Sequence, residues 1–504
     1  MKALKNISLS LLTGIILAIS WPETANQAWL IFIAFAPLFF AIDKTQNWRA
    51  VFLYSFLSFI VWHLLTVWWM WYSTPIGSLS AWIINSMLMA GIISLAKFSS
   101  NRLKWITFEI ILAFYWLAFE IFHLYWDLKW PWMYLGHAFA NHTEWIQWYE
   151  YLGVYGGGFW VIISNGLIFR LLKDPGLIPK KVYPLILTLT IILGPIFYSY
   201  TLLKKDLSND SSIKVSIVQP NVDTYTEKFN AIPPLQQSEM IIEMLINADS
   251  NSIIILPETA IPESFNKTDP YPKSVDTLLK FAKINSLKII GGFYTKDKNN
   301  SYNSVCLIED GLIKATRNKI KLLAYAEQIP FDYISVFWSQ IVHKKGGIAE
   351  SFGVDEQAKV FTLDDSQKLG TLICFESVFP DITAEMCRNG AQALFIITND
   401  DWWQDSPGYR QHFAYARIKA IENRKWIARS ANTGISGIIN NKGEIITSSG
   451  FKEKCVLKSD IELHQKNTFF CKNEKHFRIV IISLSVILII SSLLKRVKSN
   501  TRSI

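Results

Sequence analysis

The sequence is short of charge, and some long stretches of it have none. Asp, Glu, Lys and Arg make up 18% of the 504 residues, whereas hydrophobic residues make up 50% and aromatic residues 14%. No Asp, Glu, Lys or Arg occurs between Arg49 and Lys97. One membrane span takes about 20 residues. This stretch therefore predicts two spans, separated by the turn-forming residues 73–77, and it argues against an ordinary soluble protein.

A cleavage site is missing from the N-terminal region. The run Ile7–Pro22 has no charge and follows Lys2 and Lys5, as the apolar part of a secretory signal peptide would. No small-residue cleavage site follows it, and a second uncharged run, Ala25–Ile42, begins almost at once. We therefore interpret the first run as a membrane span and not as a removable signal.

The apolar runs together predict eight transmembrane helices. Lys and Arg gather in the loops on one side of these spans, and Lys129 is the only such residue in the short loops on the other side. Because positively charged loops stay in the cytoplasm, we expect both termini there and residues 204–476 outside. These residues explain much of the net charge of +9, so a nucleic-acid partner is not expected. The predicted spans are 7–22, 25–42, two within 49–97, 105–123, 155–172, 182–203 and 477–494.

The segment between the last two spans differs in composition. Short β-branched runs alternate there with polar, helix-like stretches, as in K-V-S-I-V-Q-P-N (214–221) and A-L-F-I-I-T-N-D (393–400). This alternation predicts an α/β domain whose sheets are covered by helices. The expected domains are a membrane domain at 1–204, a catalytic α/β domain at 205–470, and the last span with a basic tail at 471–504.

One cysteine lies where a strand is expected to end. Cys374 follows the apolar run G-T-L-I, and a turn that ends in proline follows it. A thiol nucleophile needs a base to take its proton and a cation to stabilise the oxyanion that forms. Glu258 and Lys319 both follow strand-like runs, and Glu327 lies eight residues after Lys319. These residues are therefore candidates for the nucleophile, the base and the oxyanion cation.

A Glu, a Lys and a Cys in this order resemble the catalytic residues of the carbon-nitrogen hydrolase (nitrilase) superfamily, which implies a four-layer α-β-β-α sandwich. With eight spans around this domain, the chain is similar over nearly its whole length to bacterial apolipoprotein N-acyltransferases. The motifs that carry the resemblance are W-P-W-M-Y-L-G (130–136), L-G-V-Y-G (152–156), V-Q-P-N (218–221), L-P-E-T-A-I-P (256–262), Y-N-S (302–304), C-F-E (374–376), N-D-D-W-W (399–403), Q-H-F-A-Y-A-R (411–417) and A-N-T-G-I-S-G (431–437).

The resemblance implies a ping-pong acyl transfer without ATP, metal or another cofactor. Cys374 would take an acyl chain from a phospholipid as a thioester. The amine of a diacylglyceryl-cysteine at a lipoprotein N-terminus would then receive it. Glu258 would act as base, and Lys319 with the backbone N–H of Phe375 would hold the oxyanion. The expected location is the bacterial inner membrane, with the catalytic domain in the periplasm and the protein a monomer.

Other residues are implied in supporting roles. Glu327 would orient Lys319, and Glu376 would brace the pocket. The segment 331–347 is a candidate lid or membrane-dipping arm, and Phe337 and Trp338 in it are candidate substrate-binding residues. Trp402 and Trp403 are equally suited to core packing and to contact with acyl chains. Cys455 and Cys471 would lie in an oxidising compartment, where a pairing between them stays open.

Two other functions use the same sequence features. A membrane-anchored amidase of the nitrilase type would have the same three residues with water as the acceptor, but it would need only one anchor. A lipid-binding or transport protein would need no nucleophile, and a Cys374→Ala variant would separate it from an enzyme. The chain also departs from the family pattern at A-Y-A-E-Q-I-P (324–330), and it lacks the tryptophan expected downstream of Asn221, for which Phe229 is a candidate substitute.

Overall fold

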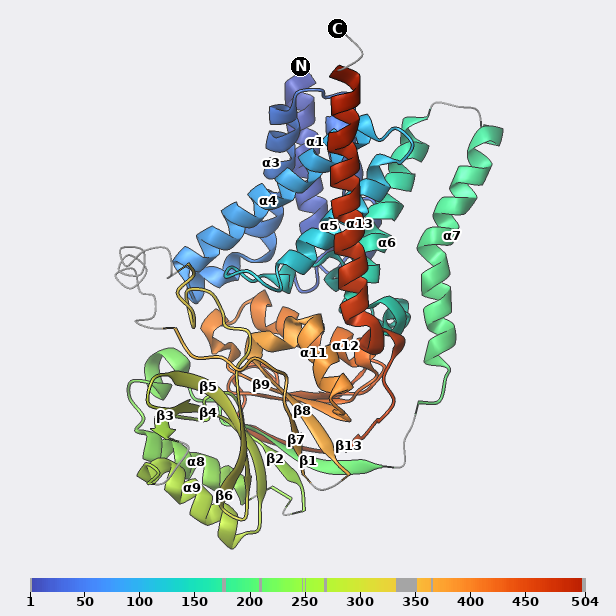
Figure 1. Cartoon of the computed structure of the whole chain (residues 1–504). Coiled ribbons are helices and arrows are strands. Elements are labelled where there is room, and N and C mark those ends of the chain that lie inside the picture. Colours follow the sequence, from blue (N-terminus) through green and yellow to red (C-terminus); the bar gives the residue numbers. More distant parts are fainter. Residues whose placement is uncertain are drawn as a thin grey trace. The chain divides into compact units, whose positions relative to one another are not determined.

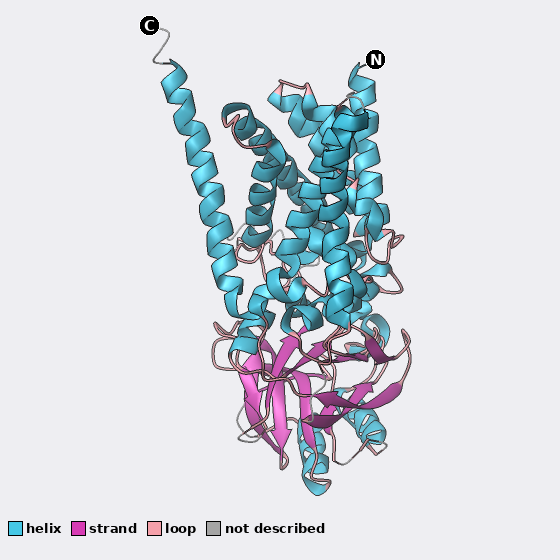
Figure 2. Ribbon diagram, turned by 90° about the vertical axis from the view of Figure 1, so that its right-hand side faces the viewer, coloured by secondary structure: helices cyan, strands magenta, loops and turns pink. Residues whose placement is uncertain are grey.

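The computed structural model describes residues 2–174, 178–207, 211–246, 248–249, 251–266, 270–331, 351–363 and 366–500. The chain divides into two compact units. Helices build the first unit, and the strands found among the described residues belong to the second (Figures 1 and 2). The first unit consists of Met1–Trp68, Pro75–Lys205 and Asn473–Ile504, and the second of Trp69–Thr74 and Asp206–Lys472.

The first unit is built from apolar helices. Within the described ranges, six of them are long and apolar enough to cross a membrane, namely α1, α3, α4, α6, α7 and α13. The prediction of an apolar domain with several helices is thereby confirmed. The helices are α1 (Lys2–Ser20), η1 (Ala28–Phe32), α2 (Ala36–Asp43), α3 (Trp48–Thr66), α4 (Pro75–Arg102), α5 (Phe108–Phe122), α6 (Tyr149–Lys173), α7 (Ile178–Leu203) and α13 (Phe469–Asn500), with short turns η3 (Pro131–Met133), η4 (Leu135–Phe139) and η5 (Thr143–Trp145) between α5 and α6.

Two of the eight predicted spans take a shorter form. The run 25–42 is divided into η1 and α2, and α5 has 15 residues. Pro37 lies in the first turn of α2, where its missing N–H is tolerated. Asn165 of α6 satisfies the backbone at the break, because its side chain accepts from Phe35 N and donates to Ile31 O, both at 2.8 Å. Where a helix is interrupted in an apolar environment, the free backbone N–H and C=O groups need hydrogen-bond partners within the protein.

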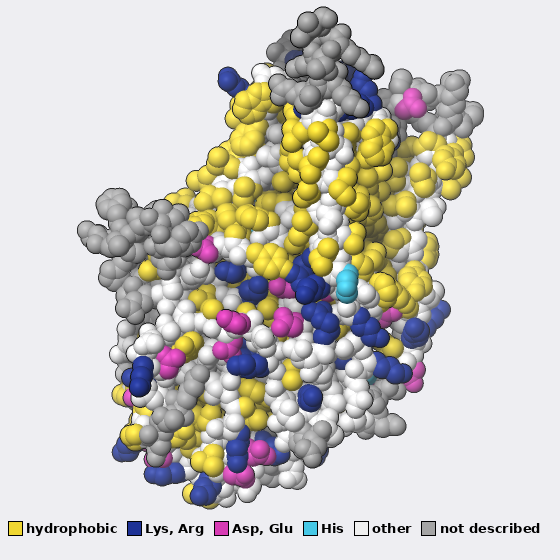
Figure 3. All heavy atoms as spheres, viewed as in Figure 1, with side chains coloured by type: hydrophobic (Ala, Val, Ile, Leu, Met, Phe, Trp, Pro, Cys, Tyr) yellow, Lys and Arg dark blue, Asp and Glu magenta, His cyan; other side chains and the backbone are white. Residues whose placement is uncertain are grey.

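The outer surface of this unit is apolar. Hydrophobic side chains cover the helices in view in Figure 3. An apolar surface of this extent is unstable in water and is suited to contact with lipid tails. Exposed examples on α7 and α13 are Leu185, Ile186, Phe197, Ile479, Val480, Ile487 and Leu494.

The second unit contains two sheets. In the described part of the chain the first has seven strands, in the order β13-β1-β2-β4-β5-β6 with β3 beside β4, and the second has six, in the order β12-β11-β10-β9-β8-β7. The inner strands are parallel, and the outer ones pair antiparallel. The strands are β1 (Ser212–Gln219), β2 (Ile253–Ile255), β3 (Ile261–Asn266), β4 (Lys288–Lys296), β5 (Ser301–Glu309), β6 (Leu312–Asn318), β7 (Val360–Thr362), β8 (Lys368–Ile373), β9 (Ala393–Thr398), β10 (Ile427–Ala431), β11 (Gly437–Ile439), β12 (Ile445–Ser448) and β13 (Cys455–Glu462).

Successive side chains of the strands enter different cores. Ile255 packs between the two sheets with Ile217 and Phe395, whereas its neighbour Ile254 packs with Leu278 of the covering helices. Helices α8 (Pro234–Leu245) and α9 (Lys273–Ile284) cover the first sheet, and α11 (Pro380–Arg388) and α12 (Pro407–Asn423) contact the second (Figure 1). The layers are helix, sheet, sheet and helix, so the predicted α-β-β-α sandwich is confirmed.

The strand directions place several loops at the carboxyl ends of strands. Glu258 follows β2, Lys319 follows β6, Cys374 follows β8 and Asn399 follows β9. In open α/β sheets, binding sites form outside the carboxyl ends of the strands. The fold therefore offers a site where these four loops meet.

Candidate active site

Cys374 lies at a strained turn. It directly follows β8 and has a φ of 51°, in the left-handed region that is uncommon for residues with a side chain. Its carbonyl oxygen accepts from the Ser377 hydroxyl at 2.8 Å and lies 3.1 Å from His412 Nε2. The other ring nitrogen of His412 lies 2.9 Å from Asp400, which pairs with Arg429. A buried polar network thus supports the turn into η7 (Cys374–Val378).

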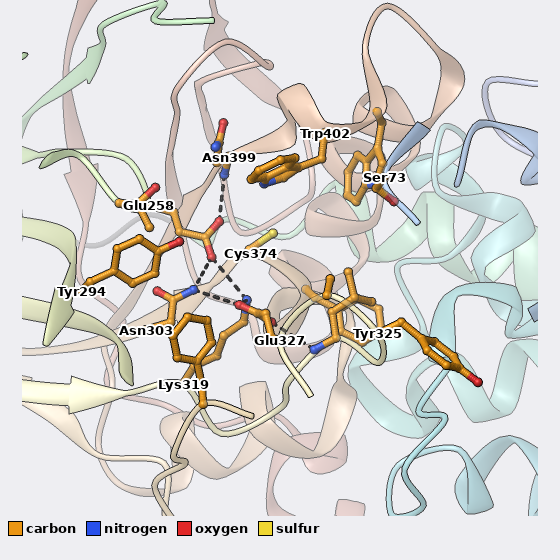
Figure 4. A pocket seen from close by; sticks show the side chains of 16 residues that line it. Ser73, Glu258, Tyr294, Asn303, Lys319, Tyr325, Glu327, Cys374, Asn399 and Trp402 are labelled. Carbon is orange, nitrogen blue, oxygen red and sulfur yellow. Dashed lines mark hydrogen bonds and ion pairs between the residues drawn. The ribbon is translucent and has the colours of Figure 1, made fainter. Parts of the chain in front are cut away.

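The side chain of Cys374 lines a cavity of about 280 Å³ (Figure 4). All lining residues belong to the second unit. Glu258, Asn303, Lys319, Glu327 and Asn399 provide its charged and amide groups, and the remaining walls are mostly apolar or aromatic. An apolar pocket with a few convergent polar groups is typical of a ligand site. The apolar and aromatic walls are Tyr294, Leu323, Tyr325, Ala326, Phe352, Phe375, Trp402 and Trp403.

Glu258 is held from three directions. It is 5% exposed, and its Oε2 accepts from the backbone N–H of Asn399 at 3.0 Å. Its Oε1 accepts from Asn303 Nδ2 at 2.7 Å and from Lys319 Nζ at 3.3 Å. Figure 4 shows these groups converging on the carboxylate beside Cys374. The carboxylate therefore has a fixed position at the cavity wall.

Lys319 lies between two carboxylates. Its Nζ is 2.7 Å from Glu327 Oε1 and 3.3 Å from Glu258 Oε1. The amide of Asn303 bridges the same two oxygens, with distances of 2.7 Å to Glu258 and 2.9 Å to Glu327. The second oxygen of Glu327 accepts from Leu323 N at 3.0 Å. The structure thus brings together the sequence-predicted Glu258, Lys319, Glu327 and Cys374 in one cavity.

Burial and charge set the protonation of these groups. Burial raises the pKa of Glu258; the Lys319 ammonium opposes this shift, and the charge of Glu327 adds to it. Burial raises the pKa of the Cys374 thiol, and the charge of Glu258 raises it further. Burial by itself would lower the pKa of Lys319, but Glu258 and Glu327 outweigh it and hold that pKa well above its usual value. The cavity therefore combines the neutral thiol of Cys374, the carboxyl group of Glu258 with a raised pKa, and the ammonium of Lys319, which stays charged.

Glu376 is not among the residues that line the cavity. It is fully buried, and its carboxylate pairs with Arg317 at 2.7 and 3.2 Å. It also accepts from Ile373 N at 2.8 Å and from Ile320 N. Because Arg317 lies on β6 and Ile373 ends β8, this carboxylate ties the two sheets together next to Cys374. A bracing role fits this position and stays a prediction.

The two adjacent tryptophans have different surroundings. Trp402 is 37% exposed and stacks against Phe229, with ring centroids 6.0 Å apart. Trp403 is 6% exposed and packs edge-on against Trp69 at 4.9 Å and His412 at 5.5 Å. Trp402 is thus the more available of the two for a ligand.

The other two predicted aromatics, Phe337 and Trp338, lie outside the described residues.

Sequence reasoning missed two residues of this site and a buried lysine whose charge acts on it. Asn303 and Asn399 lie in the motifs Y-N-S and N-D-D-W-W, but a search for acids, bases and nucleophiles assigns no role to an amide. Lys228 lies in the polar stretch T-Y-T-E-K-F, which is typical of an exposed loop, yet it is 1% exposed. Burial lowers the pKa of Lys228 to about 7, although the charges of Glu258 and Asp401 oppose this shift. Within the described ranges, no three His, Cys, Asp or Glu side chains gather as a metal site.

Comparisons with known proteins agree with a chain of two parts. The apolipoprotein N-acyltransferase N-terminal domain matches residues 13–167, and the carbon-nitrogen hydrolase domain matches residues 214–467. Among solved structures, Saccharomyces cerevisiae Nit3, of branch 10 of the nitrilase superfamily, matches with a TM-score of 0.39 and 15% identity, over 51% of this chain and 93% of its own.

Curated relatives match over most of the chain. The apolipoprotein N-acyltransferase of Chlorobaculum tepidum is 26% identical, with 92% of each chain covered. That of Geobacter metallireducens is 25% identical over 92% of this chain and 90% of its own, and that of Aquifex aeolicus is 28% identical over 90% and 98%. The chain belongs to the carbon-nitrogen hydrolase family and, through its two domains together, to the apolipoprotein N-acyltransferases.

Proposed function

We propose that the protein transfers a fatty acyl chain from a phospholipid to the α-amino group of the N-terminal diacylglyceryl-cysteine of lipoproteins. The match of both domains to curated apolipoprotein N-acyltransferases carries this proposal. The cavity adds chemical support, because it joins a thiol, a carboxyl group and a buried ammonium.

In the first half-reaction, Cys374 Sγ attacks the ester carbonyl carbon of the phospholipid while Glu258 takes the thiol proton. The charge that develops on the carbonyl oxygen is stabilised by Lys319 and by the backbone N–H of Phe375. When the tetrahedral adduct collapses, the carbon-oxygen bond breaks and Glu258 returns the proton to the leaving alkoxide. A lysophospholipid departs, and the acyl chain stays on Cys374 as a thioester.

In the second half-reaction, the lipoprotein amine attacks the thioester carbonyl. Glu258 takes a proton from the attacking nitrogen, the carbon-sulfur bond breaks, and the sulfur regains a proton. The product is an amide, and the enzyme returns to its first state. The thioester already activates the acyl group, so the transfer needs no ATP.

The charged network supports this division of roles. Glu327 holds Lys319 at 2.7 Å, and Asn303 fixes both carboxylates. The cation is therefore positioned before a substrate arrives, which is the condition under which an oxyanion site lowers a barrier most. Trp402, Phe337 and Trp338 are proposed to contact the acyl chain, whereas the buried Trp403 is proposed to support the cavity wall from the core.

The membrane arrangement belongs to the same proposal. α2 with η1, and α5, would complete eight crossings, with both termini in the cytoplasm and the catalytic domain in the periplasm. The distribution of Lys and Arg along the sequence supports this orientation. A monomer anchored in the inner membrane would meet both lipid-anchored substrates there without a water-soluble intermediate. An amidase with water as acceptor is less well supported, because the membrane part itself matches the acyltransferase N-terminal domain.

The test is intact mass spectrometry of the purified full-length protein after incubation with phospholipid alone, beside Cys374→Ser. The native protein should gain the mass of one acyl chain, hydroxylamine should remove it, and the variant should gain nothing. A diacylglyceryl-cysteine peptide should then discharge the adduct as an N-acyl peptide. Release of free fatty acid in place of that product would point to the amidase. A native protein without any adduct would overturn the proposal.

A further inference from the structure

Two cysteines outside the candidate active site lie side by side. Cys387 lies in the last turn of α11 and Cys471 in the first turn of α13, and their side chains are in hydrogen-bond contact. Both are buried, with exposures of 1% and 0%. Neither lines the cavity of Cys374, so the proposed acyl transfer does not use them.

Hydrogen bonds fix the backbone on both sides of this pair. Arg388 Nη1 donates to the Cys471 carbonyl at 2.7 Å, and Asn467 Nδ2 donates to the Cys387 carbonyl at 3.0 Å. The Cys471 thiol itself lies 3.4 Å from the carbonyl oxygen of Ala384, about one turn before Cys387 on α11. Three bonds between the same two segments therefore hold the sulfur atoms near each other.

The surroundings of the pair favour thiol chemistry. The hydrogen bond with Cys387 lowers the pKa of the Cys471 thiol, and the positive charges of Arg388 and Lys425 lower it further. Burial instead holds the pKa of the Cys387 thiol well above its usual value. Nearby cations stabilise a thiolate, and the thiolate is the species that attacks a disulfide. The two sulfur atoms are therefore close together, and Cys471 is the one that ionises more readily.

The structure also separates two possible partners of Cys471. Cys455 begins β13, where its backbone pairs with Gln219 of β1. The described contacts of the Cys471 sulfur are with Cys387 and Ala384. The pairing of Cys455 with Cys471, left open by the sequence, is therefore not the one that the fold favours.

We propose that Cys387 and Cys471 form a disulfide bond in the mature protein, which fastens the first turn of α13 to the end of α11. This inference rests on the proposed function, because it needs a catalytic domain outside the cytoplasm, where disulfides persist. The oxidant is a disulfide donor, either a thiol-disulfide oxidoreductase or oxidised glutathione. One thiolate of the pair attacks the donor disulfide, and the other then displaces the donor from the mixed disulfide. The donor leaves as two thiols, having accepted two electrons, and the two cysteines lose their protons.

The experiment starts with full-length protein whose thiols are trapped by an alkylating agent at the moment of lysis. Denaturation without reductant and peptide mass mapping follow. The expected result is a linked peptide that joins Cys387 to Cys471, lighter than the two separate peptides by two hydrogen atoms. Cys374 and Cys455 should carry the alkyl group. Alkyl groups on both Cys387 and Cys471, or a link from Cys471 to Cys455, would overturn the inference.

A second arm tests the geometry in purified protein. Oxidised glutathione should produce the same link in reduced native protein and in the matched control Cys455→Ser, but not in Cys387→Ser or Cys471→Ser. Reduction should lower the apparent Tm of native protein and of Cys455→Ser by several degrees, and leave that of the other two variants unchanged. A link that forms only with added glutathione, and is absent from the trapped protein, overturns a disulfide in the mature protein.

The acyl adduct on Cys374 is measured in the same samples. An adduct without the link rejects the disulfide alone and leaves the proposed function standing. A link without the adduct supports the disulfide and rejects the proposed acyl transfer.

Discussion

The ammonium of Lys319 lies 2.7 Å from a carboxylate oxygen of Glu327. The other oxygen of Glu327 accepts from the N–H of Leu323 at 3.0 Å, so the carboxylate is fixed by its own loop. Lys319 is therefore anchored by a group other than the proposed base Glu258. An anchor of this kind keeps the cation in place while Glu258 gains and loses a proton.

Loss of this anchor should slow the chemistry. Glu327→Gln keeps the shape of the side chain and removes its charge. A hydrogen bond to a charged group contributes about 1.5–3 kcal/mol, so thioester formation should slow by about 10- to 100-fold. Single-turnover acylation followed by mass spectrometry measures this rate. The exposed Glu356→Gln is the control, and a native rate in Glu327→Gln would show that Glu327 does not hold Lys319.

The buried pair of Glu376 and Arg317 should matter for stability. Glu376→Gln leaves the guanidinium buried without its counter-charge, which costs about 3–5 kcal/mol. The apparent Tm of the protein in detergent should fall clearly. Asp276→Asn, which breaks the exposed pair with Lys280, should change stability by less than about 1 kcal/mol. Equal losses in the two variants would contradict the bracing role of Glu376.

The raised pKa of Glu258 predicts the pH dependence of acylation. Glu258 must be ionised to take the thiol proton, so the rate should fall as the pH drops through its pKa. Because burial raises that pKa, the fall should begin at a higher pH than for an ordinary glutamate, whose pKa is about 4.3. A pH profile of single-turnover acylation tests this. A rate that stays constant down to the ordinary glutamate range would rule Glu258 out as the base.

The charge of Lys228 should affect the pH profile of acylation. Its charge favours the ionised form of Glu258, so Lys228→Met should raise the pKa of Glu258 and move the acidic limb to higher pH. Because the pKa of Lys228 itself is lowered to about 7, the difference from native protein should be largest below that pH. The exposed Lys298→Met should leave the profile in place. If both lysine variants follow the native curve, Lys228 has no influence on the base.

The two tryptophans should respond differently to replacement by alanine. Trp402→Ala should raise KM for phospholipid by about 10- to 100-fold with little change in kcat, since an aromatic contact with the acyl chain contributes about 1.5–3 kcal/mol. Trp403→Ala should instead destabilise the fold by about 3–5 kcal/mol, because it removes a buried ring beside Trp69 and His412. Steady-state kinetics and thermal unfolding of both variants separate the two roles. A loss of stability in Trp402→Ala and a raised KM in Trp403→Ala would mean that the two roles are the other way round.

The sequence by itself determined the apolar helices, the α/β domain and the candidate nucleophile with its base and cation. These features depend on local patterns: the length of an uncharged run, the alternation of strands and helices, and a reactive side chain at a strand end. Tertiary structure decided that the run 25–42 is interrupted, with Asn165 bonding the backbone at the interruption. It also decided that Glu376 forms an ion pair with Arg317. It also buried Lys228 where its charge interacts with that of Glu258, and it brought Cys387 and Cys471 together. The reason is physical, because burial and pairing depend on which distant segments meet, and no local pattern encodes that.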